Sequence, residues 1–282
     1  MLIGGISAIS LLVSLAVCLG TGAFGGGSWI WLLPVTFAGS FLALTLAAFL
    51  FLMYLCKRVD QSVPQEEDDK LYRVVTNLVI QAALPVLRIR TKVTGMEKMP
   101  KEGRFLLVSN HCDNSDPILL LRAFAKYQLA FVSKQENSDM FVIGPMMHKI
   151  QCQLINREND REALKTILNC IRMIKEDKAS IAVFPEGYTS RDHKFHTFRS
   201  GVFKIARKAN VPVVVCTITN THKVLGNLKR LKPTHIDLHL VDVITPEAYA
   251  GMTTVELGNL IHEKMAADLG PEYAPETPEE NT

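Results

Sequence analysis

The sequence predicts an α/β fold with a mostly parallel sheet flanked by helices, preceded by an N-terminal transmembrane helical anchor. No charged side chain occurs from Met1 to Cys56, so the rest of the chain carries every Lys, Arg, Asp and Glu. Beyond residue 100, short apolar runs alternate with longer amphipathic ones, as strands and helices do in layered α/β domains. The 282-residue chain is also long enough to bury an independent core.

The predicted organisation has four parts. Residues 1–58 form the membrane anchor, as a two-helix hairpin, and residues 59–93 form a linker and an amphipathic helix. Residues 94–270 form the main domain, and residues 271–282, rich in Pro and Glu, form a disordered tail.

The anchor contains two apolar segments joined by the glycine-rich turn "GTGAFGGGS". Trp29–Leu55 exceeds the roughly 20 residues that a membrane-crossing helix needs, whereas Ile3–Leu19 is marginal, so one or two spans are possible. Lys57 and Arg58 follow directly, which favours a cytoplasmic main domain at the cell membrane. A signal peptide is the alternative for residues 1–20, but a basic start and a clear cleavage site are missing.

The linker is acidic, and Asp68 or Asp69 can cap the helix that follows it. Apolar residues recur there at helical spacing, and Pro85 ends or kinks the helix. The apolar positions are Leu71, Val74, Val75, Leu78, Val79 and Ala82. This face either packs on the core of the main domain or lies in the membrane interface.

Strands and helices then alternate along the main domain. The predicted strands are "LRIRTKVTG", with Arg88, Arg90 and Lys92 opposite Leu87, Ile89 and Val93, and then "RFLLVS", "LAFVS", "CQLI", "SIAVF", "VPVVVCTIT" and "HIDLHLVDVI". The predicted helices are "PILLLRAF", "DMFVIGPMMHK", "DREALKTILNCIRMIKE", "SGVFKIARKAN" and "TVELGNLIHEKMA". In such sheets, sites gather where the strands end.

The first polar cluster is "VSNHCDNSDPILL". Asp116 or Ser115 could cap the following helix, and His111 could be an ordinary loop histidine. Alternatively, Asp116 fixes one tautomer of His111, whose other ring nitrogen then acts as a general base. Cys112 is a poor candidate nucleophile for this histidine, because adjacent side chains usually diverge.

Two further polar clusters follow predicted strands. In "LINRENDRE", Arg157 either pairs with a neighbouring carboxylate or offers a guanidinium to a phosphate. The long, basic loop "VFPEGYTSRDHKFHTFRSG" contains Glu186, Gly187, Thr189 and Arg191 as candidate substrate-binding residues. A plain loop rich in turn formers is the alternative, although loops of this length in compact domains tend to be functional.

The motifs "NHCDNSD", "INR", "FPEG" and "VPVVV", in this order across about residues 90–220, resemble the glycerophospholipid acyltransferase family, and its bacterial 1-acyl-sn-glycerol-3-phosphate type most. The resemblance implies the acyltransferase fold for residues 94–270. It implies that the catalytic residues are His111 and Asp116, that Arg157 contacts phosphate, and that the glutamate and glycine of the third motif are Glu186 and Gly187, with Val211 and Pro212 in the fourth.

One motif departs from the family pattern. Where the family has F-P-E-G-T-R, this chain reads "FPEGYTSR", with Tyr188 and Thr189 in place of Thr-Arg. Either Arg191 supplies the guanidinium from two positions later, or the third motif no longer binds a phosphate.

The resemblance implies transfer of an acyl chain from acyl-CoA or acyl-carrier protein to a lysophospholipid. The expected acceptor is 1-acyl-glycerol-3-phosphate, giving phosphatidic acid, with His111 as general base. Another lipid acceptor, a membrane-tethered lipid ester hydrolase and a silent lipid-binding module are the alternatives. No G-x-S-x-G elbow is present to favour the hydrolase.

Few other partners are expected. We expect membrane lipids as partners and no nucleic acid, cofactor or metal, since the six cysteines lack metal-ligand spacing and read as free thiols. Basic residues recur near and beyond the third motif, and they form either one positive surface or solvated lysines on unrelated faces. They are Lys194, Arg199, Lys204, Arg207, Lys208, Lys223, Lys229, Arg230 and Lys232.

Overall fold

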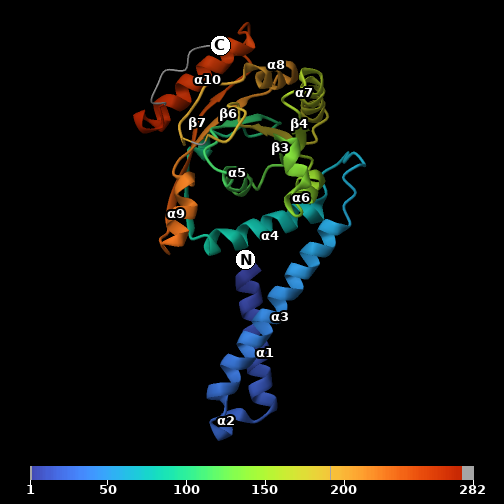
Figure 1. Cartoon of the computed structure of the whole chain (residues 1–282), viewed down its shortest axis with the longest axis vertical. Coiled ribbons are helices and arrows are strands. Elements are labelled where there is room, and N and C mark those ends of the chain that lie inside the picture. Colours follow the sequence, from blue (N-terminus) through green and yellow to red (C-terminus); the bar gives the residue numbers. More distant parts are fainter. Residues whose placement is uncertain (1, 191, 275–282) are drawn as a thin grey trace.

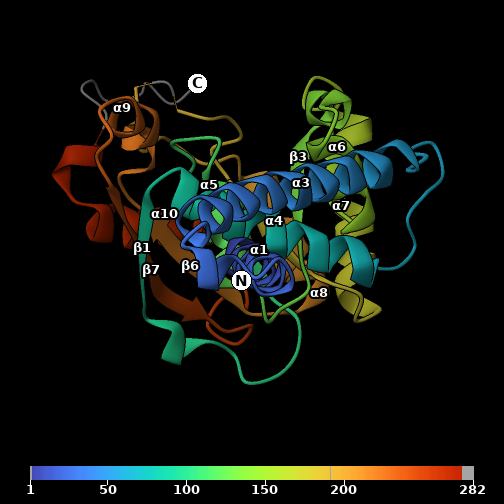
Figure 2. The ribbon, with the colours of Figure 1, turned by 90° about the horizontal axis from the view of Figure 1, so that it is seen from below.

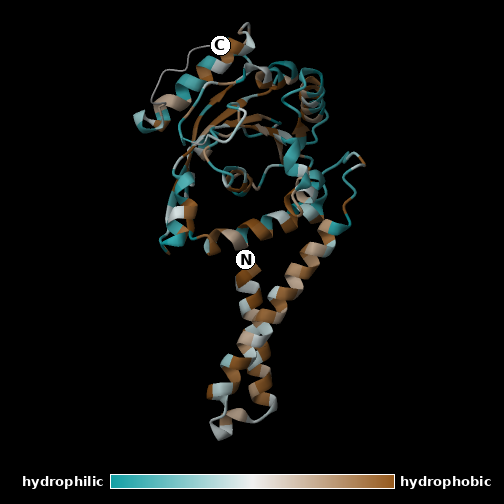
Figure 3. Ribbon diagram, in the orientation of Figure 1, coloured by the Kyte–Doolittle hydropathy of each residue, from teal (hydrophilic) through white to brown (hydrophobic). Residues whose placement is uncertain are grey.

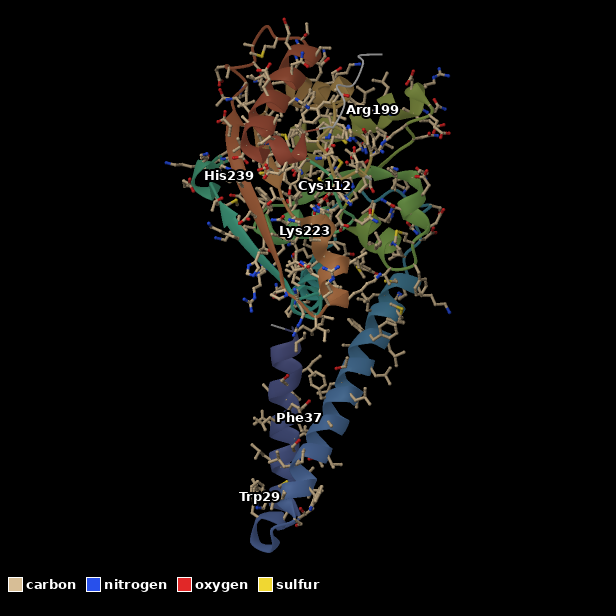
Figure 4. All side chains as sticks on the ribbon, turned by 60° about the vertical axis from the view of Figure 1, so that its left-hand side comes forward. Trp29, Phe37, Cys112, Arg199, Lys223 and His239 are labelled. Carbon is tan, nitrogen blue, oxygen red and sulfur yellow. The ribbon has the colours of Figure 1, made fainter. Side chains whose placement is uncertain are left out.

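A helical hairpin projects from an α/β body in the computed structural model, which describes residues 2–190 and 192–274 (Figure 1). Helix α1 (Leu2–Gly20) and helix α3 (Trp29–Lys57) are joined by the short helix α2 (Ala23–Gly26). Both long helices are apolar along their length (Figure 3), and both are long and apolar enough to cross a membrane. Trp29 lies near the tip of the hairpin and Phe37 between tip and body (Figure 4).

The hairpin leaves large apolar side chains on its surface. Leu12 is 66% exposed and Trp31 is 77% exposed. Moving a leucine side chain from water into an apolar environment is favourable by about 1.5–3 kcal/mol. Such a surface is stable in hydrocarbon and costly in water, so the hairpin is suited to association with a membrane.

Helix α4 (Lys70–Val86) crosses the body at the end that carries the hairpin (Figure 1). The carboxylate of Asp69 accepts hydrogen bonds from the backbone N–H groups of Leu71 and Tyr72, so Asp69 is the cap. The hydroxyl of buried Tyr72 donates to the carbonyl of Leu55 at 2.9 Å, which fixes α4 against α3. Leu71 on another side is 50% exposed, so the helix is packed on one side and presents apolar groups on the other.

Seven strands form one sheet in the order β1-β7-β6-β2-β5-β3-β4. Only the β6–β7 pair is antiparallel, and the other five pairs are parallel, which confirms the prediction of a mostly parallel sheet. The strands are β1 (Ile89–Thr94), β2 (Leu106–Ser109), β3 (Leu129–Lys134), β4 (Gln153–Ile155), β5 (Ser180–Val183), β6 (Val213–Ile218) and β7 (Thr234–Ile244).

The edge strand β1 is less buried than its alternation predicts. Ile89 is buried, but Val93 is 39% exposed because β1 has a neighbour on one side only. Its pairing with β7 also makes β1 a strand of the sheet, although residues 89–93 fall in the predicted linker segment.

Helices cover both faces of the sheet. Side chains alternate along β2, so that Leu106 and Val108 enter one core cluster and Leu107 enters the other. The first cluster includes side chains from α7, α8 and α10, and the second includes side chains from α5. These helices are α5 (Asp116–Ala123), α6 (Ile143–Lys149), α7 (Asp160–Lys175), α8 (Lys204–Ala209), α9 (Val224–Lys229) and α10 (Thr254–Leu269).

The first residues of the predicted disordered tail are packed on the body. Pro271–Tyr273 forms a 3-10 turn, Tyr273 is buried, and its hydroxyl accepts a hydrogen bond from the N–H of Asn220 at 2.9 Å. The aromatic ring gives this short segment enough apolar surface to bury. The rest of the predicted tail, residues 275–282, lies outside the described residues.

Candidate active site

The first polar cluster begins where β2 ends. Asn110 is 1% exposed, and its side-chain amide makes two hydrogen bonds with the backbone of Ile218 at the end of β6. The Nδ2 group donates to the Ile218 carbonyl at 2.9 Å, and Oδ1 accepts from the Ile218 N–H at 2.8 Å. These two bonds fix the point from which His111 leaves the sheet.

Asp116 is fully buried and turns its carboxylate back toward this loop instead of capping α5. Its Oδ2 accepts three hydrogen bonds, from the backbone N–H groups of Cys112 and Asp113 at 2.8 Å each and from Nδ1 of His111 at 2.9 Å. Because two of these donors are backbone N–H groups, Oδ2 is also the acceptor in its hydrogen bond with the ring. Nδ1 of His111 therefore carries a proton, and Nε2 is left as the acceptor.

The imidazole of His111 is held on its ring face as well. The ring of Phe184 stacks on it with centroids 4.2 Å apart and an interplanar angle of 18°. The side chain of His111 is 15% exposed, and its Nε2 lies 2.9 Å from the hydroxyl oxygen of Thr189. The basic nitrogen thus faces a hydroxyl group in the resting site.

Glu186 connects the first motif to the third. It is 1% exposed, and its two oxygens accept hydrogen bonds from the backbone N–H groups of His111 at 2.8 Å and His196 at 3.2 Å. Burial raises the pKa of Glu186 to about 8. The two backbone hydrogen bonds lower this pKa in part, and the charge of Asp116 raises it. The carboxyl group is therefore mostly protonated at neutral pH and acts as a structural link.

Gly187 allows the chain to turn sharply after this link. Its φ angle is +85°, in the region that favours glycine, and its N–H donates to the carbonyl of Phe184 at 3.1 Å. A Cβ atom at this position would lie 3.0 Å from Cδ and Nε of Arg199. The glycine therefore leaves room for the Arg199 side chain to lie against the third motif.

Arg199 and Arg157 line the same cavity, which has a volume of about 470 Å³. Among the described residues, neither guanidinium has a hydrogen bond or an ion pair. Burial lowers the pKa of Arg157, and the nearby positive charge of Arg199 lowers it further. Much of the rest of the wall is apolar: Val132, Ile155, Leu164, Ile167, Val183, Phe184 and Val202. The cavity thus suits an amphiphilic molecule with an anionic group.

A second, more open cavity of about 750 Å³ lies beside Thr189 and the first loop. Its polar wall is formed by Cys112, Asp113, Asn114, Lys134, Tyr188, Thr189, Ser190, Asp192, His193 and His196. Residues 184, 185 and 187 line the Arg157 cavity, and residues 188–190 line this one. The third motif therefore borders both spaces.

Cys112 is not suited to act as a nucleophile. Its side chain lies inside the body (Figure 4) and is 3% exposed. Burial raises the pKa of its thiol to about 12, and the charges of Asp116 and Glu186 add to this effect. The thiol therefore stays protonated at neutral pH, where the reactive thiolate is needed.

The structure brings together His111, Asp116, Glu186 and Thr189, and it places Arg157 in the adjoining cavity with Gly187 between them. Arg191 lies outside the described residues. Sequence reasoning did not assign a site role to Phe184, Asn110 or Arg199. Phe184 and Asn110 stood inside the recognised motifs, whereas Arg199 is separated from them and only its charge signalled it.

Two groups of the basic residues, on α8 and on α9, lie on different faces of the body. Arg207 and Lys208 belong to α8, and Lys229 to α9, and these two helices lie on opposite sides of the body in both ribbon views (Figures 1 and 2). The interpretation of solvated charges on separate faces holds for these two groups. Within residues 2–190 and 192–274, no cluster of three His, Cys, Asp or Glu side chains is arranged to hold a metal ion.

Residues 90–219 match the family model described as Acyltransferase. A probable 1-acyl-sn-glycerol-3-phosphate acyltransferase of Mycoplasma pneumoniae is 30% identical over 178 residues, or 62% of this chain and 64% of that protein. A 1-acyl-sn-glycerol-3-phosphate acyltransferase of Haemophilus influenzae is 27% identical over 175 residues, or 61% of this chain and 72% of that protein. The chain spans less than two thirds of the mycoplasma relatives it matches, 64% and 62% of their lengths.

The fold is similar to the crystal structure of the 1-acyl-sn-glycerophosphate acyltransferase PlsC from Thermotoga maritima. The TM-score is 0.61, the sequence identity is 22%, and the alignment covers 84% of this chain and 97% of that chain. Residues 90–219 thus match the acyltransferase family that the ordered motifs resemble, and the fold is similar to that of a solved acyltransferase.

Proposed function

We propose that this chain transfers an acyl group from an acyl thioester to the free hydroxyl of a lysophospholipid. The proposed acceptor is 1-acyl-glycerol-3-phosphate, and the product is then phosphatidic acid. The observation that carries the proposal is the His111–Asp116 pair, in which Nδ1 donates to a buried carboxylate and Nε2 faces a hydroxyl group. Relatives named as 1-acyl-sn-glycerol-3-phosphate acyltransferases add support for the acceptor.

In the proposed reaction, Nε2 of His111 takes the proton of a hydroxyl group as its oxygen attacks the thioester carbonyl. Asp116 holds the imidazole in the required tautomer and stabilises the imidazolium that forms. When the tetrahedral intermediate collapses, the C–S bond breaks and the leaving sulfur takes the proton from Nε2.

Arg157 and Arg199 are the proposed binding groups for the acceptor phosphate. A guanidinium can donate two parallel hydrogen bonds to phosphate oxygens, and these two have no carboxylate partner among the described residues. A phosphate would also relieve the repulsion that contributes to the lowered pKa of Arg157. The apolar walls of the same cavity offer a place for the chain of the acceptor.

The proposed location is the cell membrane, with the body on its cytoplasmic side. Lys57 and Arg58 at the end of α3 support this orientation through the positive-inside tendency. The donor is then a cytoplasmic acyl thioester, either acyl-CoA or acyl-carrier protein.

The test is an acceptor screen with the purified full chain in detergent. Lysophospholipids with different headgroups are each supplied with palmitoyl-CoA or palmitoyl-acyl-carrier protein, and products are identified by mass spectrometry. We expect phosphatidic acid from lysophosphatidate with at least one donor, and none from His111→Ala. Free fatty acid as the sole product would instead identify a hydrolase, and product from another headgroup alone would reassign the acceptor.

A further inference from the structure

A basic turn at the end of α9 carries an exposed leucine. This basic turn is residues 229–232, which read "KRLK" and are all exposed. Leu231 is 72% exposed, and its φ angle of +53° lies in the left-handed region that residues with a side chain rarely adopt. Glycine or asparagine is the usual occupant of such a position. The chain thus holds a large apolar side chain on its surface, at a position where a small residue would be less strained.

The basic turn is hydrogen-bonded to the segment that follows α4. The guanidinium of Arg88 donates to the carbonyl of Leu231, and the N–H of Thr234 donates to the carbonyl of Arg88 at 3.0 Å. Val86, the last residue of α4, is 65% exposed. Two exposed apolar side chains, Val86 and Leu231, therefore belong to segments that are fixed to each other.

Both segments lie at the end of the body from which the hairpin projects. Helix α9 leads from Lys223 toward the hairpin (Figure 4), and its lower end is level with α4 (Figure 1). Seen from below, α9 lies to one side of the hairpin (Figure 2). A bilayer that holds the hairpin would therefore have its surface near the basic turn, at a distance from the point where the hairpin enters.

The charge of the basic turn is not neutralised by neighbouring carboxylates. No Asp or Glu occurs between Asp192 and Asp237 in the sequence. Within residues 2–190 and 192–274, the side chains of Lys229, Arg230 and Lys232 form no ion pair. In the free chain these charges face solvent, and an anionic surface could replace part of that solvent.

Cations beside an exposed leucine match the interface of a membrane that contains anionic lipids. Lysine and arginine have long apolar stems, so their charges can stay among the headgroups while the leucine enters deeper. An acidic protein would also match the charges. The lipid surface is favoured because the basic turn lies at the same end of the body as the hairpin, whose surface is apolar.

We propose that the basic turn is a second membrane contact, which binds the anionic lipid surface of the membrane that holds the hairpin. Leu231 and Val86 enter the boundary between headgroups and acyl chains. Lys229, Arg230 and Lys232 bind the lipid phosphates. Together, the hairpin and the basic turn limit how far the body can tilt on the membrane. The contact does not depend on acyl transfer, and it weakens in neutral lipid and at high salt.

The test measures whether position 231 enters the bilayer. The full chain with Leu231→Cys, labelled with nitrobenzoxadiazole, is placed in nanodiscs of phosphatidylcholine alone or with about 30% phosphatidylglycerol, an anionic lipid. Quenching by a nitroxide on the lipid acyl chain reports contact with the interface. Lys208→Cys on α8 is the matched control position, because it is also exposed and lies on the opposite side of the body. Wild type treated with the same label corrects for the native cysteines.

With phosphatidylglycerol, quenching at position 231 should exceed that at position 208 by about fivefold or more. It should fall by about half or more when salt is raised from about 0.1 M to about 1 M, because the screening length shortens from about 10 Å to about 3 Å. Lys229→Gln combined with Arg230→Gln should lower it similarly. Arg207→Gln combined with Lys208→Gln removes the same two charge types from the end of α8 and should leave it unchanged.

Equal quenching at positions 231 and 208 would overturn the proposal. Quenching at position 231 that is the same with and without phosphatidylglycerol would also overturn it, because the binding of anionic lipid would then be absent.

Hydrogen exchange of unlabelled wild type tests the same contact without a substitution. Amides of residues 224–234 should exchange about threefold or more slowly in discs with phosphatidylglycerol than in discs of phosphatidylcholine alone, and those of residues 204–209 should not change. Acyl-carrier protein added to the phosphatidylcholine discs is the comparison for an acidic protein. If it slows exchange in residues 224–234 and phosphatidylglycerol does not, the partner is an acidic protein and the lipid contact is overturned.

Discussion

Two histidine–aspartate pairs in this molecule have nearly the same geometry and very different surroundings. His111 Nδ1 lies 2.9 Å from Asp116, and His239 Nδ1 lies 2.7 Å from Asp268. The side chains of the first pair are 15% and 1% exposed, whereas those of the second are 35% and 24% exposed. His239 lies on β7 at the edge of the body, and Cys112, next to His111, lies in its interior (Figure 4).

The difference lies in what each pair is connected to. Asp116 receives two backbone N–H groups, and its histidine faces a hydroxyl and a cavity. Asp268 receives the Thr217 hydroxyl and joins α10 to the sheet. A short His–Asp distance is therefore a poor guide to a general base. Burial of the carboxylate and a hydroxyl at the second ring nitrogen distinguish the two sites.

The largest expected effect comes from disrupting each pair in turn. His111→Ala should lower kcat by roughly 1,000-fold or more, because it removes the proposed base. Asp116→Asn should lower kcat by roughly 10³ to 10⁴-fold, because the imidazole is then no longer held in the required tautomer. His239→Ala should leave kcat within about twofold of wild type and cost about 1 kcal/mol of stability or less. Steady-state kinetics and urea unfolding of the three variants check this. Equal loss of kcat in His239→Ala and His111→Ala would contradict the comparison.

A double variant sharpens the same point. His111→Ala combined with Asp116→Asn should be no slower than His111→Ala alone, since the two residues act as one unit. If the effects multiply, Asp116 has a role that does not pass through His111.

The two arginines provide the next largest effect. Arg157→Gln should raise KM for a lysophosphatidate acceptor by about 10- to 100-fold, which corresponds to losing about 1.5–3 kcal/mol of charged hydrogen bonding. Exposed Arg199 should contribute less, about 3- to 10-fold for Arg199→Gln, because solvent screens its charge. Arg207→Gln on α8 is the matched control.

Comparing acceptors with and without a phosphate shows whether the arginines bind that group. With a monoacylglycerol, which has no phosphate, all three arginine variants should have the wild-type KM. An increase in KM for both acceptors would indicate damage to the cavity instead of a lost phosphate contact.

Glu186 provides a smaller, pH-dependent effect. Its pKa of about 8 in the folded chain lies above its ordinary value of 4.5, so the folded state binds the proton more tightly. Its contribution to stability is therefore complete below pH 4.5 and decreases as the pH rises toward 8, by up to about 1.4 kcal/mol per pH unit.

The side chain of Glu186→Gln cannot titrate. Its NH₂ group also cannot accept a hydrogen bond, so one of the two backbone N–H groups of His111 and His196 loses its acceptor. We expect it to be less stable than wild type at pH 5 by about 1–3 kcal/mol, and the difference should narrow toward pH 8. Chemical unfolding of both proteins across this range measures it. A constant difference would mean that Glu186 is ionised in the fold.

The smallest expected effect is that of Cys112, which neighbours the proposed catalytic pair but has a protonated, buried thiol. Cys112→Ser should keep kcat within about twofold of wild type. Iodoacetamide should likewise leave the activity of the folded wild type unchanged. Inactivation that Cys112→Ser prevents would require a reactive thiolate at this position.

The elements of the fold were predictable from local patterns. Alternating apolar runs located the strands, and the cap of α4 was narrowed to Asp68 or Asp69 because capping depends on neighbouring residues only, and it is Asp69. The strand order was not predictable, since pairings such as β1 with β7 join segments far apart in the sequence. Helix α9 was missed because it is short and carries little periodicity.

In the candidate site, too, contacts between residues close in the chain were predictable and contacts between distant loops were not. His111 and Asp116 are close in the chain, so their spacing allowed the pair, and the resemblance of the ordered motifs to the acyltransferase family favoured it over a helix cap and a loop histidine. The contact between Thr189 and His111 and the approach of Arg199 to Gly187 are set by how two loops meet at the end of the sheet. Sequence spacing contains no information on such contacts, and the loss of the motif arginine gave no indication of what the replacing threonine would touch.

The Asn110 amide has a consequence for the whole sheet. A peptide group also presents one donor and one acceptor, so this side chain serves as an extra rung of the β2–β6 ladder after the β2 backbone has left it. At the other end of β2, the N–H of Leu106 donates to the Pro212 carbonyl at 3.0 Å. β2 is thus hydrogen-bonded at both ends to β6, which lies about a hundred residues later in the sequence. A one-residue shift of β6 would therefore displace His111. The position of the proposed base therefore depends on β6 as well as on the loop that contains His111.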